Sequence, residues 1–136
     1  SFAEDGFTLE EHKMINETRK ILGQATLPVC ATCVRVPVFV GHSISVNAEL
    51  ESNFDLSAIS KALGAFDGIV LHEAQDEFPT AADASGFDDV HVGRLRRDPS
   101  VENGVAMWVV ADNLRKGAAT NAVQIAELIY ENQRWS

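Results

Sequence analysis

The segment Val105-Ala-Met-Trp-Val-Val-Ala111 decides the fold class, because it carries an apolar side chain at every position. Alternate residues of a strand point to opposite faces of a sheet, so both faces of this strand are apolar. A strand of that kind needs cover on both sides and is typical of the middle of a sheet. We therefore predict a central strand over Val105–Ala111, with its neighbours among the other segments that favour strands.

Four further segments are predicted to be strands. Ser43–Leu50 alternates cleanly, with apolar residues at the even positions and polar residues at the odd ones. One of its faces is therefore expected to meet a core, and the other to meet water or a polar partner surface. Shorter strands are predicted at Gly68–Leu71 and Asp89–Arg96. Pro28–His42 is dense in β-branched residues and is also predicted to be strand.

Three helices are predicted around these strands. Thr8–Leu22 opens with a capping box formed by Thr8 and Glu11, and Leu56–Leu63 ends at a glycine. A last helix over Leu114–Asn132 has a narrow seam of small and apolar residues. The seam consists of Ala118, Ala122, Ile125, Ala126 and Ile129. The acidic stretch His72–Phe87 is predicted to be loop.

The order helix, two strands, helix, three strands, helix indicates an α+β fold. We expect a mixed, largely antiparallel sheet with the helices packed on one face. The 136 residues contain 46% apolar and 23% charged residues, without repeats or linkers, which is typical of one domain over residues 1–136.

Charge and cysteine content exclude several classes of protein. The chain has a net charge of −9, which argues against nucleic acid and anionic membrane surfaces as partners. No apolar run approaches the ~20 residues of a membrane span. Two cysteines are too few for a disulfide framework, so a cytoplasmic location is expected.

Cys30-Ala-Thr-Cys33 has the C-x-x-C spacing of redox and zinc sites. In a strand, positions three apart point to opposite faces, and no second pair of ligands stands at zinc spacing. We therefore predict two buried, unreactive cysteines and no metal site.

Arg35 and His42 are candidates for binding and catalysis. An arginine can hold a carboxylate through two parallel hydrogen bonds, and a histidine can act as general acid or base near neutral pH. Their separation of seven residues would aim them at opposite faces of an unbroken strand. Because Pro37 removes a ladder donor and Gly41 permits a bulge, we predict a break or bulge between Val36 and His42.

Glu10 and Lys13 share one face near the start of the first helix. They are consistent with an ordinary surface ion pair, which Glu17 and Lys20 repeat one heptad later, or with groups of a binding site.

Arg94, Arg96 and Arg97 concentrate positive charge in an acidic chain, and alternation would put Arg94 and Arg96 on one face. We expect them to pair with carboxylates, with contact to a bound anion as the alternative. The glycine-rich motifs that cradle nucleotide phosphates are absent from the sequence.

Four blocks of sequence carry a resemblance to a known enzyme family. Thr8–Met14 continues into Glu17–Leu22, and Ala31–Ser43 contains the specific pattern Arg-Val-Pro-Val-x-x-Gly-His. Asp112-Asn-Leu-Arg-Lys-Gly-Ala-Ala-Thr-Asn-Ala122 is the third block, and Val92–Asp98 is a weaker fourth. In order and spacing, over essentially the whole chain, they resemble the C-terminal half of aspartate-semialdehyde dehydrogenase.

The resemblance implies a C-terminal domain like that of glyceraldehyde-3-phosphate dehydrogenase, in an NADP-dependent enzyme. That enzyme interconverts aspartyl 4-phosphate and aspartate 4-semialdehyde on the route to lysine, threonine and methionine. By matching positions, Arg35 would hold the substrate's α-carboxylate and Glu10 its amino group. Lys13 would contact phosphate, His42 would be the general acid/base, and Asn113 would contact NADP.

The sequence departs from the family in two respects, the nucleophilic cysteine and the Rossmann glycines, both of which belong to the nucleotide-binding half. The nucleophilic cysteine of the family lies in an Asn-Cys context of the nucleotide-binding half, and neither Cys30 nor Cys33 has that context. The chain thus resembles a domain that carries only half of the active-site residues, and we expect it to lack dehydrogenase activity by itself. The helix within 113–136 is expected to pack on a nucleotide-binding domain, or without it to fold back, swap or lose order.

The family resemblance also implies a homodimer formed through the sheet, with the polar face of Ser43–Glu49 at the twofold contact. Two alternatives stay open. One is a catalytically silent paralogue that serves only in assembly, for which the four polar positions would be unnecessary. The other is a related acyl-phosphate reductase acting on a different substrate.

Overall fold

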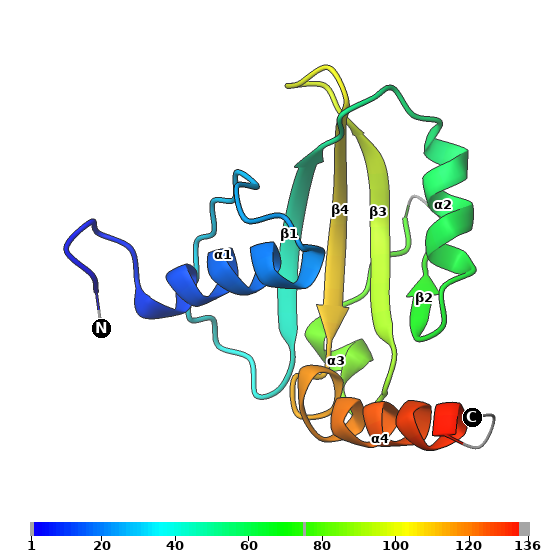
Figure 1. Cartoon of the computed structure of the whole chain (residues 1–136). Coiled ribbons are helices and arrows are strands. Elements are labelled where there is room, and N and C mark those ends of the chain that lie inside the picture. The colour runs from blue at the N-terminus through cyan, green and yellow to red at the C-terminus, as the bar shows by residue number, and fades with distance from the viewer. Residues whose placement is uncertain (1, 75, 134–136) are drawn as a thin grey trace. The chain divides into compact units, whose positions relative to one another are not determined.

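The computed structural model describes residues 2–74 and 76–133, and these divide into two compact units. The N-terminal unit covers residues 1–37 and the C-terminal unit residues 38–136. The N-terminal unit contains helix α1, Leu9–Leu22. The C-terminal unit contains strands β1 (His42–Glu49), β2 (Ile69–Leu71), β3 (Val90–Asp98) and β4 (Gly104–Ala111), and helices α2 (Leu56–Gly64), α3 (Ala81–Ala84) and α4 (Thr120–Gln133) (Figure 1).

Helix α1 begins and ends as its sequence predicts. The Thr8 hydroxyl accepts a hydrogen bond from the backbone N–H of Glu11 at 3.2 Å, and Glu11 Oε2 accepts one from the N–H of Thr8 at 2.7 Å. This capping box satisfies two donors that the first helical turn leaves without partners. Gly23 ends the helix in the left-handed conformation, at φ +66°.

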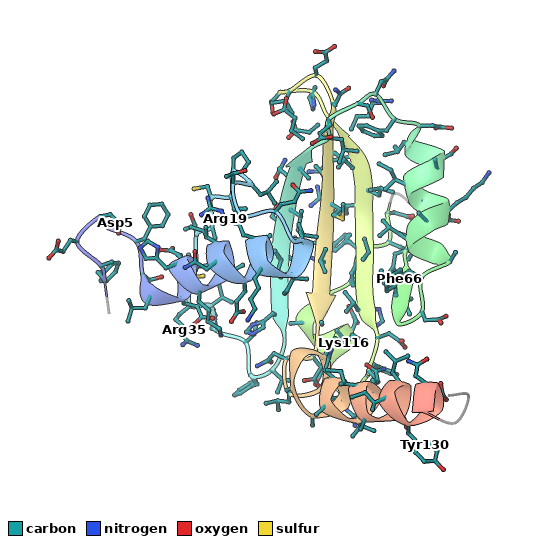
Figure 2. All side chains as sticks on the ribbon, in the orientation of Figure 1. Asp5, Arg19, Arg35, Phe66, Lys116 and Tyr130 are labelled. Carbon is teal, nitrogen blue, oxygen red and sulfur yellow. The ribbon has the colours of Figure 1, made fainter. Side chains whose placement is uncertain are left out.

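The strand predicted over Pro28–His42 is wrong, because Pro28–Gly41 contains no strand and β1 begins only at His42. β-Branched residues favour strands only where a neighbouring strand accepts and donates the ladder hydrogen bonds. Here the N–H of Cys33 donates instead to the Glu11 carboxylate, at 2.8 Å. The guanidinium of Arg19, labelled in Figure 2, donates to the carbonyl of Leu27 at 2.8 Å.

The C-terminal unit is built on a four-stranded sheet in the order β1-β4-β3-β2. β4 pairs antiparallel with β1 and β3, and β2 pairs parallel with β3. The predicted α+β class and its mixed, largely antiparallel sheet are confirmed, and β4 lies in the middle as its apolar faces indicate. Figure 1 shows the long strands β1, β4 and β3 side by side, with the short β2 beside α2.

One detail of the expected arrangement differs, because α2 and α3 contact opposite faces of the sheet. Val110 of β4 is fully buried in a cluster with Ala84 of α3. Leu71 of β2 lies next to Gly64 of α2. It pairs with Val92 of β3, which in turn pairs with Val109 of β4, so Leu71 and Val109 lie on the same face of the sheet. Since Val109 and Val110 are neighbours on one strand, they point to opposite faces. Each of these helices therefore covers a different side.

The stretch predicted as the loop His72–Phe87 contains the short helix α3. Thr80 begins it with a second capping box, in which its hydroxyl accepts from the N–H of Asp83. Just before this cap, the carbonyl of Pro79 accepts a hydrogen bond from Trp108 Nε1 at 2.9 Å. The helix is thereby attached to the central strand.

The last helix begins at Thr120 rather than at Leu114. Lys116, Gly117 and Ala118 have backbone angles outside the helical region, with Gly117 at φ +83°. The side chain of Asn121 accepts a hydrogen bond from the N–H of Gly117, which stabilises this irregular turn. Ala118 therefore lies outside the helix, and the predicted seam keeps four of its five residues.

Candidate functional site

Glu10 and Lys13 lie side by side on the first turns of α1. Lys13 Nζ is 3.3 Å from Glu10 Oε1, and both side chains are more than half exposed. The hydrogen bond and the negative charge of Glu10 raise the pKa of Lys13 above its ordinary value. The ion-pair interpretation of these residues is confirmed, and the pair presents a carboxylate and an ammonium group together at the surface.

Arg35 belongs to the segment that follows α1 in the N-terminal unit (Figure 2). It is exposed, and within the described part of the chain its guanidinium has no hydrogen bond or ion pair. Its backbone position is set two residues earlier, where the N–H of Cys33 is bound by the carboxylate of Glu11. A guanidinium without a partner on a tethered segment can receive a carboxylate through two hydrogen bonds.

Glu11 positions the segment that carries Arg35, and the sequence predicted only one of its two contacts. Its role in the capping box follows from spacing, but its second contact spans 22 residues of chain to Cys33 and has no local signal. The side chain is only 8% exposed. The N–H groups of Thr8 and Cys33 hold the pKa of this carboxyl below its ordinary value, because both donate to the charged form.

The two cysteines differ in environment, so the prediction of buried thiols is wrong for Cys30, which is exposed. Cys33 is half-buried, and its thiol donates to the sulfur of Met14 at 3.4 Å. Burial and the nearby carboxylates of Glu11 and Glu10 raise the pKa of Cys33, which disfavours the thiolate. Residues 2–74 and 76–133 contain no cluster of three metal-ligating side chains.

His42 stands at the first position of β1, directly after the predicted chain break. Gly41 has φ +97°, and a Cβ at this position would lie 3.3 Å from the Cβ of Ala81. A side chain here would therefore be both strained and crowded. No strand precedes His42, so the predicted break is not an interruption of a strand. The turn at Gly41 leads directly into β1 and leaves the imidazole exposed at the end of an edge strand, opposite Ala111.

Asn113 lies next to this turn although it is 72 residues from Gly41. Its side-chain oxygen accepts a hydrogen bond from the N–H of Gly41 at 2.9 Å. The amide thus ties the segment after β4 to the turn before His42. Its NH2 group has no partner within the described residues and can donate to a ligand.

Asp112 is a second residue that sequence reasoning missed. It is 4% exposed, and its two carboxylate oxygens accept hydrogen bonds from the N–H groups of Gly86 and Leu114, each at 2.8 Å. These bonds lower the pKa of the carboxyl. Its place before Asn113 makes it the anchor of that residue's backbone. The contact with Gly86 is set by the fold, so no pattern along the sequence indicates it.

Within the described residues, no carboxylate forms a close salt bridge with Arg94, Arg96 or Arg97. The charges of Arg96 and Arg97 do interact with the carboxylates of Asp98 and Asp55, so the predicted pairing is present only in this weaker form and not for Arg94. The guanidinium of Arg97 lies over the ring of Phe54, 4.3 Å from its centre, and donates to the Phe54 carbonyl. Arg96 Nη1 donates to the carbonyl of Arg94 at 2.9 Å. The strand is not regular here, because the register shifts by a bulge between Gly93 and Arg96.

The predicted site residues fall into two groups. Glu10, Lys13 and Arg35 belong to the N-terminal unit, and His42 and Asn113 belong to the C-terminal unit. That these residues belong to one active site is implied by the family resemblance and stays a prediction. No helix within the described ranges is long and apolar enough to cross a membrane.

Comparison with known proteins identifies a common family. The family model described as semialdehyde dehydrogenase, dimerisation domain, matches residues 1–116. The chain is 50% identical over 130 residues to aspartate-semialdehyde dehydrogenase of Aquifex aeolicus, which covers 94% of this chain and 38% of that protein. It therefore spans well under half of that relative's length.

Solved structures give the same result. The chain matches aspartate semialdehyde dehydrogenase II from Vibrio cholerae, complexed with ASA, with a TM-score of 0.91 and 49% identity over 96% of this chain and 39% of that one. It also resembles aspartate semialdehyde dehydrogenase with NADP from Candida albicans, with a TM-score of 0.67 and 26% identity over 91% of this chain and 43% of that one.

Proposed function

Because the chain belongs to the semialdehyde dehydrogenase dimerisation-domain family, we propose that it is the substrate-binding and dimerisation domain of an NADP-dependent aspartate-semialdehyde dehydrogenase. The observation that carries the proposal is the match over residues 1–116 together with 50% identity to a relative of that activity. The chain covers 38% of this relative, so the nucleotide-binding half and the nucleophilic cysteine would come from a further domain. The whole enzyme would serve amino-acid biosynthesis in the cytoplasm.

In this proposal the substrate is recognised by charge. Arg35 binds the α-carboxylate in two parallel hydrogen bonds, and the exposed carboxylate of Glu10 binds the α-ammonium. Lys13 binds the phosphate as a point charge, for which its raised pKa keeps it protonated. The present pairing of Glu10 with Lys13 is a surface contact that both groups can exchange for ligand at small cost.

His42 would be the general acid/base. Since the turn at Gly41 leads directly into β1, the imidazole projects from the end of an edge strand rather than from within a ladder. It can accept the proton of the attacking thiol and return a proton to the oxygen of the aldehyde carbon.

NADP would supply the hydride acceptor and donor for the aldehyde carbon. The residues present fit one contact to it, because the Asn113 side chain keeps its NH2 group as a free donor while its oxygen holds Gly41. The exposed apolar face of α4 would pack on the nucleotide-binding domain. Ile125, Leu128 and Ile129 share one side of the helix and are each 51–60% exposed, which is typical of a surface that another domain covers.

Dimerisation through the sheet accords with the family description and with the edge position of β1. The serine-rich face of β1 is exposed, and a second copy could cover it by twofold symmetry. Light scattering on the chain at tens of micromolar should give the mass of a dimer. A monomer at that concentration would count against this part of the proposal.

A chimera tests the catalytic proposal. This chain replaces the corresponding C-terminal segment of the Vibrio cholerae enzyme, and phosphate-dependent NADP reduction by aspartate semialdehyde is followed by absorbance. We expect activity, a loss of about 10²-fold or more in kcat for His42→Ala, and a raised KM for Arg35→Lys. Glu17→Gln on α1, at a position with no proposed role, is the control and should change neither kcat nor KM.

The same experiment separates the alternatives. A folded, dimeric chimera without activity would favour a module for assembly only. Full activity in His42→Ala would remove the acid/base assignment while leaving the family membership intact.

A further inference from the structure

A cavity of about 580 Å³ lies in the C-terminal unit where the start of α2, the end of β2 and the bulge of β3 meet. Leu56, Leu71 and Leu95 supply apolar walls, one from each of these elements. Every lining residue belongs to the C-terminal unit, and none is among those assigned above to substrate, proton transfer or cofactor. The cavity is therefore separate from the residues of the proposed substrate site.

The charge of the lining is positive although the chain has a net charge of −9. Arg94 and Arg96 line the cavity, and neither forms an ion pair with a carboxylate of the described residues. Glu73 also lines it, but that carboxylate accepts a hydrogen bond from the Ser60 hydroxyl at 2.9 Å. Both guanidinium groups are exposed, and the carboxylate of Asp98 lies close enough to Arg96 to interact with its charge. The N–H groups of the two arginines can nevertheless donate to an anionic group whose apolar portion lies against the leucines.

The backbone of Arg94 is unusual. It has φ +56°, and among the described residues it is the only one other than glycine with a positive φ. The register shift between Gly93 and Arg96 makes this a bulge, and the left-handed position of such a bulge is the one that glycine occupies without strain. An arginine here has an energetic cost that its side chain does not offset through any ion pair within the described chain. Strained residues of this kind cluster at binding sites.

We propose that this cavity binds a small molecule with an apolar portion and a carboxylate or phosphate group, held by Arg94 and Arg96. The three leucine side chains contact the apolar portion, and the two guanidinium groups bind the anionic end. The bulge of β3 is then the device that turns consecutive residues of one strand toward the ligand. This inference does not depend on the proposed function.

Amide chemical shifts of the ¹⁵N-labelled 136-residue chain test the site. The chain is titrated separately with phenyl phosphate, benzoate, inorganic phosphate and uncharged benzyl alcohol. We expect the two aromatic anions to shift the amides of residues 56–60, 71–74 and 94–96. Benzyl alcohol and inorganic phosphate, which each lack one half of the chemistry, should bind at least about tenfold more weakly. The stronger of the two aromatic anions tells a phosphate ester from a carboxylate as the natural ligand class.

Variants separate charge from strain. Arg94→Gln with Arg96→Gln should weaken binding at least about tenfold. Arg94→Gly should weaken binding as well but raise the melting temperature, because glycine relieves the positive φ. Arg97→Gln is the matched control, since that guanidinium lies over Phe54 and does not line the cavity.

Three results would overturn the proposal: shifts confined to other residues, no shift up to the solubility limit of the probes, or unchanged affinity in the double variant. A loss of affinity in Arg97→Gln as large as that in the double variant would also overturn the proposal. The anion would then be attracted by the positive charge of the whole strand and not by this cavity.

Discussion

Two buried carboxylates, one in each unit, make similar bonds in different surroundings. Glu11 is 8% exposed and Asp112 is 4% exposed. Each carboxylate accepts hydrogen bonds from two backbone N–H groups that lie in different segments of the chain. Asp112 lies beside an apolar core that includes Val110. Among the described residues of the N-terminal unit, Glu11 itself is the only buried side chain. The C-terminal unit therefore depends on apolar packing, whereas the N-terminal unit depends on hydrogen bonds of charged side chains, those of Glu11 and Arg19 among them.

The largest effect is expected for Val110→Asp in the C-terminal unit. Val110 of β4 is fully buried against α3, so the new carboxylate would lose its hydration without gaining a hydrogen-bond partner. We expect a loss of at least about 4 kcal/mol in the free energy of unfolding, measured by urea denaturation followed by tryptophan fluorescence.

Val123→Asp is the matched control for that substitution. Val123 is 57% exposed on α4, so the same change should alter the free energy of unfolding by less than about 1 kcal/mol. Equal effects at the two positions would show that packing around Val110 is not what stabilises the C-terminal unit.

Gly41→Ala should have the second largest effect, about 2 kcal/mol. Its φ is +97°, and the new Cβ would lie 3.3 Å from that of Ala81. Gly86→Ala is the control, because Gly86 has φ +85° with open space around it and should lose about 1 kcal/mol. If thermal melts give the same loss for both, the crowding at Gly41 does not hold the turn before His42.

The strands and helices of the C-terminal unit could be predicted because their signals are local. The fully apolar Val105–Ala111 reflects the cover of a central strand, and the alternation of Ser43–Leu50 matches β1, in which Val46 and Ala48 are less exposed than their neighbours. Pro28–Gly41 failed for the opposite reason. Its β-branched residues favour an extended backbone, but whether an extended segment joins a sheet depends on a partner strand that local composition does not encode.

The candidate site divides in the same way. The spacing of Glu10 and Lys13 on one helix face was enough to predict their contact, since a helix brings positions three apart together. The contact of Asn113 with Gly41 spans 72 residues and that of Glu11 with Cys33 spans 22. These hydrogen bonds depend on how the chain folds back on itself, so residue spacing gives no indication of them.

Glu11→Gln should release the segment that carries Arg35. Gln offers one oxygen where the carboxylate uses two, so its NH2 group would face a backbone donor, either Thr8 or Cys33. We expect the Cys33 amide to exchange with solvent about tenfold faster, measured by hydrogen exchange and NMR. The Cys33 thiol should also react faster with a disulfide reagent, and exchange as slow as in the parent chain would contradict the role of this tie.

Acid should act on the same tie. The pKa of Glu11 is lower in the folded chain than in the unfolded chain, so the stabilisation is fully present above the unfolded value near 4.3. It is lost as the pH falls through the lower folded value. Protection of the Cys33 amide should therefore be constant between about pH 7 and 5 and fall only below about 4. A loss of protection that begins near pH 6 would point to a histidine instead.

The smallest effect is expected one residue away, for Glu10→Gln. The carboxylate of Glu10 is 61% exposed and meets only Lys13, so a thermal melt should shift by less than about 2 °C. The pKa of Lys13, followed by NMR of its side chain at high pH, should fall toward its ordinary value, because Glu10 is the main cause of its rise. Glu17→Gln, on the same helix, should lower that pKa less. If Glu10→Gln destabilised the chain as much as Glu11→Gln, the exposed pair would have a structural role, and neither group would be free to exchange its partner for an amino-acid phosphate.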